Sequence, residues 1–296
     1  QANLWTEYIT TTEKAEYMVL PRMLALAEVV WSPKQNRDWK NFSERLVSHF
    51  KAFEQKGYHY CPGNFTVNIK PVSESGKLSV TLTNEILNSD IYYTVEGSIP
   101  TLQSIKYSEP IKVESSATVK AVTVLNGVVM GLKPNELNFV FHKAIGKTVT
   151  YTNPVSNYYK AEGSNSLTDG IRGTYSVGKY WHGFSEKDFV ATVDLGAITS
   201  IQNITIGCLQ KYKDWIFLPQ WVEFEVSKDG VSFTEIQTLQ NPVSINEKEN
   251  IHDFKISFTP LQVRYVRITG KNNLCPPGHS GEGKPGWIFA DEIIVQ

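Results

Sequence analysis

Short segments in which apolar and polar residues alternate recur from residue 65 to the end of this 296-residue chain. Alternation with a period of two puts one set of side chains on each face of a strand, so each segment predicts a half-buried β-strand. Such strands need partners that cover their apolar face, and two facing sheets provide them. The predicted strands are residues 65–70, 77–83, 90–95, 110–113, 117–124, 135–141, 189–196, 201–209, 221–230, 252–258, 263–270 and 287–295.

Loop sequences divide this β-rich part into two predicted domains. Residues 62–143 have short strands separated by the turn sequences SESG, EGSIPT and LNG, typical of a small antiparallel sandwich of immunoglobulin-like or fibronectin-like shape. Residues 144–296 have longer strands and aromatic-rich loops, which favours a jelly-roll sandwich. The joints near Pro62 and Lys143 are short, so we expect the domains to be docked against one another.

Residues 1–61 follow a helical pattern instead. The spacing from Thr10 to Glu13 predicts a capping box for a first helix, and Pro21 then restarts the helix at an allowed first-turn position. Asp38 can cap a second helix, whose apolar residues recur at helical spacing until Gly57 ends it.

The first five residues, QANLW, are apolar and lack a cap, so they predict the end of a buried strand. One strand and two helices would leave apolar faces uncovered, and such a segment is not a domain by itself. We therefore expect its packing partners to lie ahead of Gln1.

Composition excludes some partners. The formal net charge is -1, which gives no reason to expect nucleic acid or an anionic membrane. No apolar run reaches the roughly 18 residues that a membrane-spanning helix needs. Aromatic residues make up 12% of the chain, and many lie in predicted loops. This enrichment fits flat ligands such as sugars, and it equally fits aromatic-rich sandwich cores.

QANLWTEY, followed by AEYMVLPRMLALAEVVWSP, resembles the last strand and final helices of glycoside hydrolase family 20. These β-N-acetylhexosaminidases are built on a (β/α)8 barrel, so the resemblance implies that residues 1–61 are the C-terminal end of such a barrel. The whole chain is then a mostly β multidomain protein. Active sites of these barrels lie at the C-terminal ends of the strands, where Trp5 and Glu7 are placed.

The resemblance implies that Trp5 forms part of the aromatic wall around the terminal sugar and its acetamido group. It implies that Glu7 accepts hydrogen bonds from the 4- and 6-hydroxyls. Spacing alone leaves another interpretation, in which Trp5 is a core residue and Glu7 is a surface carboxylate or an ion-pair partner.

Enzymes of this family carry an adjacent Asp–Glu pair on an earlier strand. The Glu is the acid and base, and the Asp orients the acetamido group that attacks the anomeric carbon, a substrate-assisted route with retention. In this chain the two residue types are adjacent, in that order, only at Asp291-Glu292, in a predicted strand of the last domain. We therefore expect no catalytic residue in this chain, no cofactor for catalysis, and no hydrolysis by the chain alone.

The implied partners are N-acetylhexosamine-containing glycans and the missing N-terminal portion of the barrel. The substrate class implies a secreted, periplasmic or cell-surface protein. DIYYTVEGSIPTLQSIKYSEPIKV, residues 90–113, resembles the small sandwich that follows the barrel in many bacterial hexosaminidases, where we expect a structural role.

The segments DFVATVDLG, VEFEVSKDGVSF, VRYVRITG and WIFADEIIV resemble the discoidin, or coagulation-factor type C, sandwich. Carbohydrate-binding module family 32 has the same fold. The resemblance implies a structural calcium ion held by oxygen ligands. The alternative is an ordinary Asp-Gly turn with a hydrated carboxylate. The implied ligands are the side chains of Asp169, Thr174 and Glu292 and the carbonyls of Leu167, Ile171 and Ala290.

In this calcium turn, Ile171 and Arg172 replace the polar and Pro residues often found in the family. Modules of this type bind sugars with loop residues at one end of the sandwich. The candidates are Trp181, His182 and Trp215. The alternatives are that both Trp side chains are buried plugs and that His182 is a loop hydrogen-bonding residue.

Three function hypotheses follow: part of a glycosidase, a carbohydrate-binding module, or purely structural accessory domains. The first requires an Asp–Glu pair ahead of Gln1, and the second requires measurable glycan affinity of residues 145–296.

Overall fold

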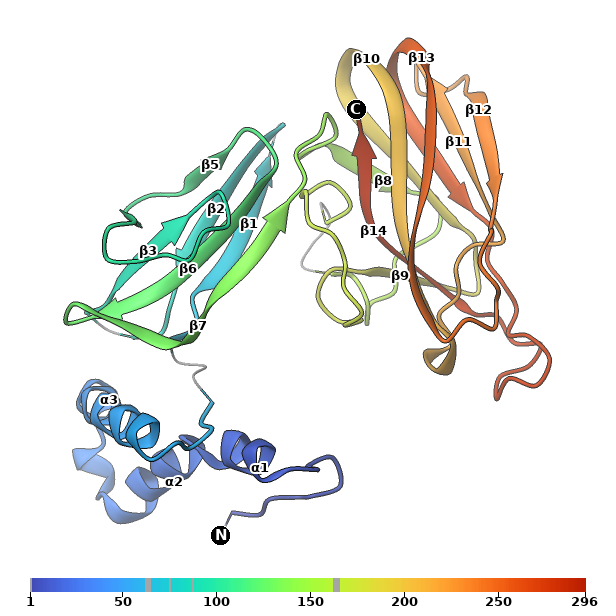
Figure 1. Cartoon of the computed structure of the whole chain (residues 1–296). Helices are drawn as coiled ribbons and strands as arrows, with labels where there is room; N and C mark the ends of the chain where they lie inside the picture. The colour runs from blue at the N-terminus through green and yellow to red at the C-terminus, as the bar shows by residue number, and fades with distance from the viewer. Residues whose placement is uncertain (1, 62–64, 75, 87, 162–165) are drawn as a thin grey trace.

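The computed structural model describes residues 2–61, 65–74, 76–86, 88–161 and 166–296. Helices come first, and two bodies built of strands follow (Figure 1). No described helix is long and apolar enough to cross a membrane. The predicted joint near Pro62 lies outside the described residues. The helices are α1 (Thr12–Val19), α2 (Arg22–Trp31), the 3-10 helix η1 (Lys34–Asn36) and α3 (Trp39–Gln55).

The helix ends follow capping rules. Asp38 caps α3 as predicted, because its Oδ1 accepts a hydrogen bond from Asn41 N at 2.6 Å. Gly57, with φ +71°, follows α3 in the left-handed conformation that ends a helix. The cap of α1 is Thr11, which accepts from Lys14 N at 3.2 Å, so the predicted capping box at Thr10 is one residue early.

The strand predicted for residues 1–5 is absent from the described residues 2–5, which are exposed and have no strand pairing. Gln1 lies outside the described residues. A strand exists only through hydrogen bonds to a neighbour, and no described strand lies in register with this segment.

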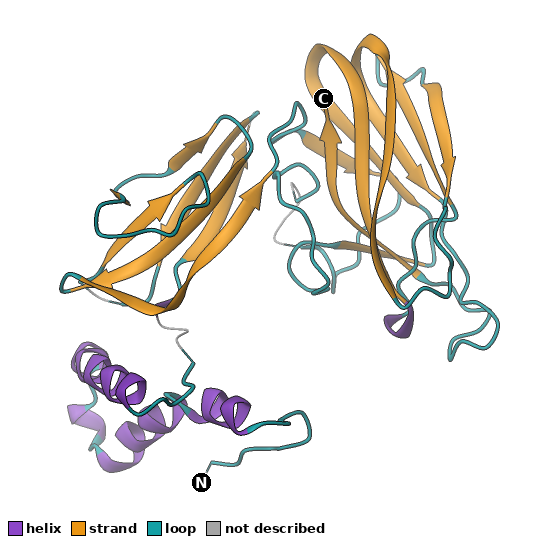
Figure 2. Cartoon of the chain, in the orientation of Figure 1, coloured by secondary structure: helices purple, strands orange, loops and turns teal. Residues whose placement is uncertain are grey.

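The first sandwich is formed by two antiparallel sheets (Figure 2). Alternation sets its core: along β2, the side chains of Leu78, Val80 and Leu82 are buried and those between them are not. One sheet contains β1 (Asn68–Glu74), β2 (Lys77–Thr83) and β5 (Ile111–Val113). The other contains β4 (Ile105–Lys106), β3 (Asp90–Thr94), β6 (Ala117–Leu125) and β7 (Val128–Phe139).

Helix α3 packs against the end of this sandwich. Its buried Phe42, Leu46 and Phe50 form one apolar cluster with Phe65 and Met130. The ring centroids of Phe50 and Phe65 are 4.6 Å apart, in an edge-to-face arrangement. This contact is the link between the helical segment and the strands.

The second sandwich is a hydrogen-bonded set of strands in the order β12-β11-β13-β10-β14-β9, with β8 also paired to β10. Its two longest strands each cover two predicted ones, because β-bulges near Asp194 and Ile201 bend the chain without ending its pairing. The strands are β8 (Thr148–Tyr151), β9 (His182–Ser185), β10 (Phe189–Lys211), β11 (Trp221–Ser227), β12 (Thr234–Gln240), β13 (Glu249–Gly270) and β14 (Trp287–Val295).

The two sandwiches are joined closely. Val140 N donates to Gly170 O and Lys143 N donates to Val295 O, both at 2.8 Å. Ile145 and Ile171 are buried with residues of the first sandwich core. The joint therefore carries both backbone hydrogen bonds and shared apolar packing.

Candidate functional site

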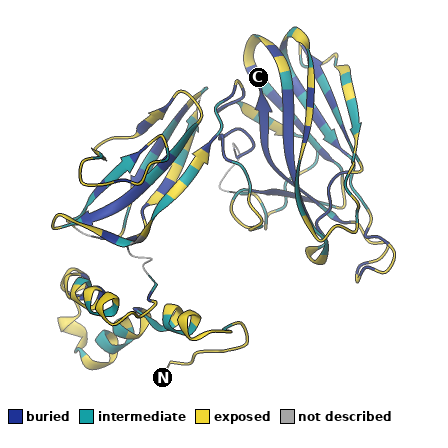
Figure 3. Ribbon diagram, in the orientation of Figure 1, coloured by how far each residue is buried: buried dark blue, intermediate teal, exposed yellow. Residues whose placement is uncertain are grey.

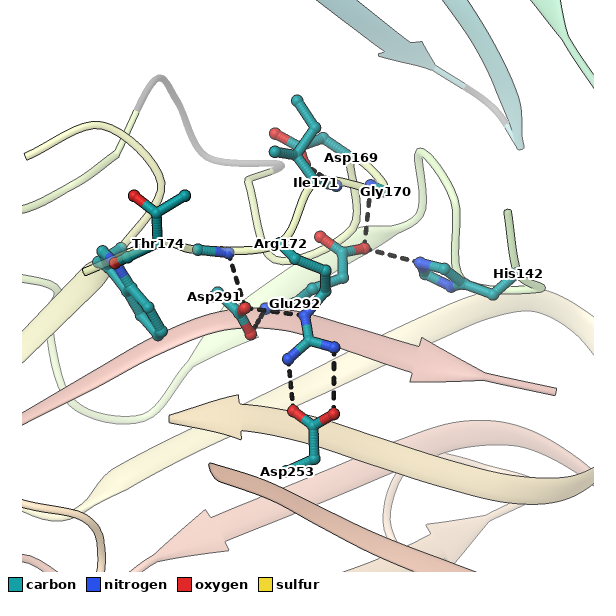
Figure 4. Close-up of polar contacts among 11 residues, drawn as sticks. His142, Asp169, Gly170, Ile171, Arg172, Thr174, Asp253, Asp291 and Glu292 are labelled. Atoms are coloured by element: carbon teal, nitrogen blue, oxygen red, sulfur yellow. Dashed lines mark hydrogen bonds and ion pairs between the residues drawn. The ribbon is translucent and has the colours of Figure 1, made fainter. Parts of the chain in front are cut away.

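A cluster of buried carboxylates lies where the second sandwich meets this joint (Figure 4). Strand β14 is buried along almost all of its length, so Asp291 and Glu292 are both 0% exposed. Charged groups in such a position require partners, because burial disfavours the ionised form.

Glu292 has a partner for only one of its two oxygens. Its Oε1 accepts from Gly170 N at 3.1 Å and lies 2.7 Å from His142 Nε2. His142 Nδ1 accepts a hydrogen bond from Ala144 N, so the ring proton lies on Nε2. This N–H donates a hydrogen bond to Glu292 Oε1. Glu292 Oε2 is buried and has no hydrogen-bond partner among the described residues.

The electrostatics of this pair follow from burial. Burial lowers the pKa of His142 to about 3, so this imidazole is neutral near pH 7. Burial, and after it the nearby Asp169 carboxylate, raises the pKa of Glu292 well above its ordinary value. Both effects disfavour the ionised form of Glu292, which a cation bound nearby would favour.

By comparison, both carboxylate oxygens of Asp291 have hydrogen-bond partners. Its Oδ2 accepts from Arg172 Nε and from Gly173 N, both at 2.8 Å, and its Oδ1 accepts from Glu292 N at 2.6 Å. The same guanidinium also pairs with Asp253. Burial raises the pKa of Asp291, and the Arg172 charge acts in the opposite direction.

A glycine makes room for this ion pair. A Cβ at Gly207 would lie 2.2 Å from Asp291 Oδ1 and 2.3 Å from the Arg172 guanidinium. Any side chain at this position in β10 would therefore displace the pair.

The structure brings only some of the predicted calcium ligands together. Asp169 is buried near Glu292, and its Oδ1 accepts from Ile171 N at 2.9 Å. Thr174 is exposed and accepts from Ser176 N, and Figure 4 shows it beyond Asp291, apart from Glu292. The remaining predicted positions, Leu167, Ile171 and Ala290, are buried.

Within the described ranges, no three His, Cys, Asp or Glu side chains are grouped so that they could hold a metal ion. A metal site here would need backbone carbonyls beside the two carboxylates.

Two of the three predicted sugar-binding residues are buried, and this prediction is wrong for them. Trp181 is 0% exposed, packs with Leu209, Ile216 and Phe289, and donates from Nε1 to Thr174 O at 2.8 Å. His182 is buried in β9, with Nδ1 3.1 Å from the Tyr151 hydroxyl. Neither ring can face a sugar, because strands and loops of the sandwich cover both.

Trp215 differs from these two because it is half-buried at the loop end of the second sandwich. Its backbone is left-handed, with φ +64°, directly after the 3-10 helix η3 (Tyr212–Asp214). Lys284 Nζ lies 5.7 Å from the ring centroid, and His279 contacts the ring edge-on. A depression of about 530 Å³ that Trp215 does not line is formed by Lys211, Lys213, Asp214, Glu247, Lys248 and Glu249.

At the other end of the chain, Trp5 is 81% exposed and Glu7 is also exposed. A turn closed by Ile9 N donating to Thr6 O at 3.0 Å follows Trp5. No described residue forms an ion pair or a hydrogen bond with the Glu7 carboxylate. The interpretation of Trp5 as a core residue is therefore wrong for this chain.

Comparison with protein families divides the sequence into three matched parts. Residues 1–34 match the catalytic domain of glycosyl hydrolase family 20, residues 80–129 match the Fn3 associated family, and residues 148–283 match the F5/8 type C domain. The chain resembles the C-terminal part of a family 20 β-N-acetylhexosaminidase. The resemblance predicted from the sequence is confirmed.

Characterised relatives agree with this resemblance. A β-hexosaminidase of Porphyromonas gingivalis is 32% identical over 133 residues, which cover 43% of this chain and 17% of that protein. A β-N-acetylhexosaminidase of Cellulomonas fimi is 38% identical over 60 residues, which cover 20% of this chain and 12% of that protein. The chain thus spans less than a fifth of the length of these two relatives.

Solved structures include two similar sugar-binding modules. Chitosan-binding module 1 of a chitosanase/glucanase from Paenibacillus sp. IK-5 has a TM-score of 0.34 at 17% identity, covering 52% of this chain and 98% of that one. The module CpGH89CBM32-5 of Clostridium perfringens, solved with GalNAc-beta-1,3-galactose, has a TM-score of 0.34 at 19% identity, covering 50% of this chain and 92% of that one.

Sequence reasoning missed three residues that surround the two β14 carboxylates: His142, Arg172 and the exposed Asp253. The signal for Arg172 was present, because a charged residue replaces the usual family residue in the predicted calcium turn. His142 and Asp253 carry no local signal, since only the fold brings them to Asp291 and Glu292.

Proposed function

We propose that this chain is the C-terminal part of an enzyme that removes terminal N-acetylhexosamine with retention of configuration. The observation that carries the proposal is the family 20 match of residues 1–34, which includes an exposed Trp5 and an exposed Glu7. An indole face packs against the C–H face of a pyranose, and a carboxylate accepts hydrogen bonds from two hydroxyls. These two residues would then contribute to one wall of the sugar pocket.

Catalysis would require an Asp–Glu pair that belongs to the rest of the barrel. Asp291 and Glu292 cannot replace it, because both carboxylates are fully buried and bound to Arg172 and His142. The chain alone is inactive under this proposal, and its immunoglobulin-like sandwich supports the barrel. From the substrate class we further propose that the whole enzyme is secreted, periplasmic or on the cell surface.

Hydrolysis of an aryl N-acetyl-β-glucosaminide tests the proposal. The 296-residue chain should give no turnover. A longer protein that carries the rest of a family 20 catalytic domain ahead of Gln1 should be active, and should lose activity when its Asp–Glu pair is replaced. Turnover by the 296-residue chain, or no turnover by the longer protein, would contradict the proposal.

A second function, glycan docking by the C-terminal sandwich, is supported by the partial exposure of Trp215 beside Lys284. A partly exposed aromatic ring and an ammonium group in the loops at one end of a sandwich are suited to binding a sugar. Trp215→Ala should weaken binding to N-acetylhexosamine- or galactose-bearing glycans, while Trp39→Ala, on α3, should not. Equal affinity of both variants and the unmodified chain would favour a purely structural role for this end.

We also propose a structural calcium ion at the buried carboxylates. The fit rests on Glu292 Oε2, a buried acceptor with no described partner, and on Asp169 close by. Arg172 is committed to Asp291 and Asp253, and a bound cation would give Glu292 Oε2 a partner and favour the ionised carboxylate. Asp169, Glu292 and the carbonyls of Leu167, Ile171 and Ala290 would hold the ion, whose preferred ligands are oxygens. Its role would be to tie the Asp-Gly turn to β14.

A further inference from the structure

A cleft of about 340 Å³ lies between α3 and the first sandwich, and no motif in the sequence marked it. One wall is a single face of α3, because its lining residues recur three, four, seven, eight and eleven positions after Lys40. The opposite wall comes from Ile86 and Asn88, which follow β2, and from Leu125 and Asn126, where β6 turns into β7. The cleft is at the small end of the size range of ligand sites.

Ser43 forms part of the helical wall of the cleft and is only 6% exposed. Its hydroxyl oxygen is buried and forms no hydrogen bond with any described residue. Because this oxygen has almost no accessible surface, an occupant of the cleft would contact the exposed polar groups around it instead.

The floor and rim differ in chemistry. Val47, Ile86 and Leu125 give an apolar floor that belongs to the cluster joining α3 to the sandwich. The amides of Asn88 and Asn126 stand on the rim, where both backbones are left-handed, with φ +57° and +51°. An apolar floor with hydroxyl and amide groups around it suits one face of a sugar ring.

The charged groups of the rim are unpaired and net positive. Lys40 and Lys51 outnumber Glu44, and no described residue forms an ion pair with any of the three. Two free ammonium groups above an apolar floor favour a ligand that carries negative charge.

We propose that this cleft binds a single sugar unit that carries an acidic group, a sulfate ester or a carboxylate. Lys40 and Lys51 hold the anion, the two Asn amides bind ring hydroxyls, and the apolar floor supports the ring. The site goes beyond the proposed function, because it shares no residue with Trp5 and Glu7 or with the Trp215 end. Loss of this site would leave hydrolysis by the longer protein unchanged.

Titration calorimetry on the 296-residue chain tests the proposal with N-acetylglucosamine 6-sulfate, glucuronic acid, N-acetylglucosamine and inorganic sulfate. At least one charged sugar should bind about tenfold more tightly than the neutral sugar and inorganic sulfate. Which charged sugar binds identifies the acidic group. The double variant Lys40→Met, Lys51→Met should remove this preference.

Lys56→Met, which changes a lysine at the end of the same helix but outside the cleft, is the matched control and should bind as the unmodified chain does. All variants should keep the thermal midpoint of the unmodified chain. The proposal is overturned if no sugar binds, if neutral and charged sugars bind equally, if inorganic sulfate binds as tightly as the sugar sulfate, or if the double lysine variant keeps the preference.

Discussion

Helices α1 and α2 differ sharply from strand β14 in how far their side chains are buried (Figure 3). Neither helix contains a buried residue, although α2 carries Met23, Val30 and Trp31, the last of them 86% exposed. In β14 every residue after Trp287 is buried, including two carboxylates. Both regions belong to parts with a family resemblance, but only β14 takes its environment from the rest of the described chain.

This contrast teaches that a family match does not show where a residue's packing partners lie. The second sandwich contains its own core, so its buried charges are explained by contacts within it. The apolar face of α2 is explained, under the proposed function, only by a barrel. Substitutions that are chemically the same should therefore have different effects in the two regions.

The largest contrast is expected between two Trp→Ala variants. Trp181→Ala removes a fully buried ring and should lower the free energy of unfolding of the second sandwich by about 3–5 kcal/mol. Trp5→Ala removes an exposed ring and should change the stability of this chain by less than about 0.5 kcal/mol. Guanidinium unfolding of both variants measures the difference, and equal losses of unfolding free energy would contradict the expected contrast.

Two arginine substitutions compare a buried ion pair with a partly exposed one in the second sandwich. Arg172→Met leaves Asp291 buried without its cation and should cost about 3 kcal/mol of stability. Arg264→Met breaks a pair with Asp194 in which both side chains are partly exposed, and should cost less than about 1 kcal/mol. Thermal unfolding compares the two, and a smaller loss for Arg172→Met would contradict the assigned role of the buried pair.

Calcium removal tests the carboxylate site. With free calcium about a hundredfold above its dissociation constant, binding to the native state adds about 2.7 kcal/mol, so a chelator should lower the thermal midpoint. Glu292→Gln should make the midpoint insensitive to chelator, whereas Glu235→Gln, on an exposed part of β12, should not. If chelator did not change the thermal midpoint of the unmodified chain, the proposed ion would be ruled out.

The smallest effect concerns the helical segment, where caps matter because burial is limited. Asp38→Ala removes the acceptor of Asn41 N and should cost about 1 kcal/mol, while Asp38→Asn keeps a capping side chain and should cost little. Circular dichroism during thermal unfolding reports both. A loss in Asp38→Asn equal to that in Asp38→Ala would show that the cap is not the cause.

The sequence predicted strand positions well because alternation is a local signal, as Leu78, Val80 and Leu82 in β2 illustrate. It did not predict that residues 189–211 form one strand. The apolar pattern stops around Gly196, where the chain is exposed, but hydrogen bonding resumes after a bulge. Continuity of pairing depends on the neighbouring strand β13, which no local pattern describes.

The sites were predicted less completely for the same reason. Trp181 and Trp215 look equivalent in sequence, since each lies in an aromatic-rich loop. Leu209, Ile216 and Phe289 come from distant segments to bury the first, while the second stays half-exposed. The resemblance placed Asp169 and Glu292 near one another, and the partners His142 and Asp253 required the fold.

The central claim is that Trp5 and Glu7 hold the terminal sugar of a family 20 enzyme. The most direct test is kcat/KM for an aryl N-acetyl-β-glucosaminide, measured in a longer protein that carries the rest of the catalytic domain. Trp5→Ala and Glu7→Gln should each lower kcat/KM by about tenfold or more. Unchanged kcat/KM in both Trp5→Ala and Glu7→Gln, with the enzyme active, would contradict the account.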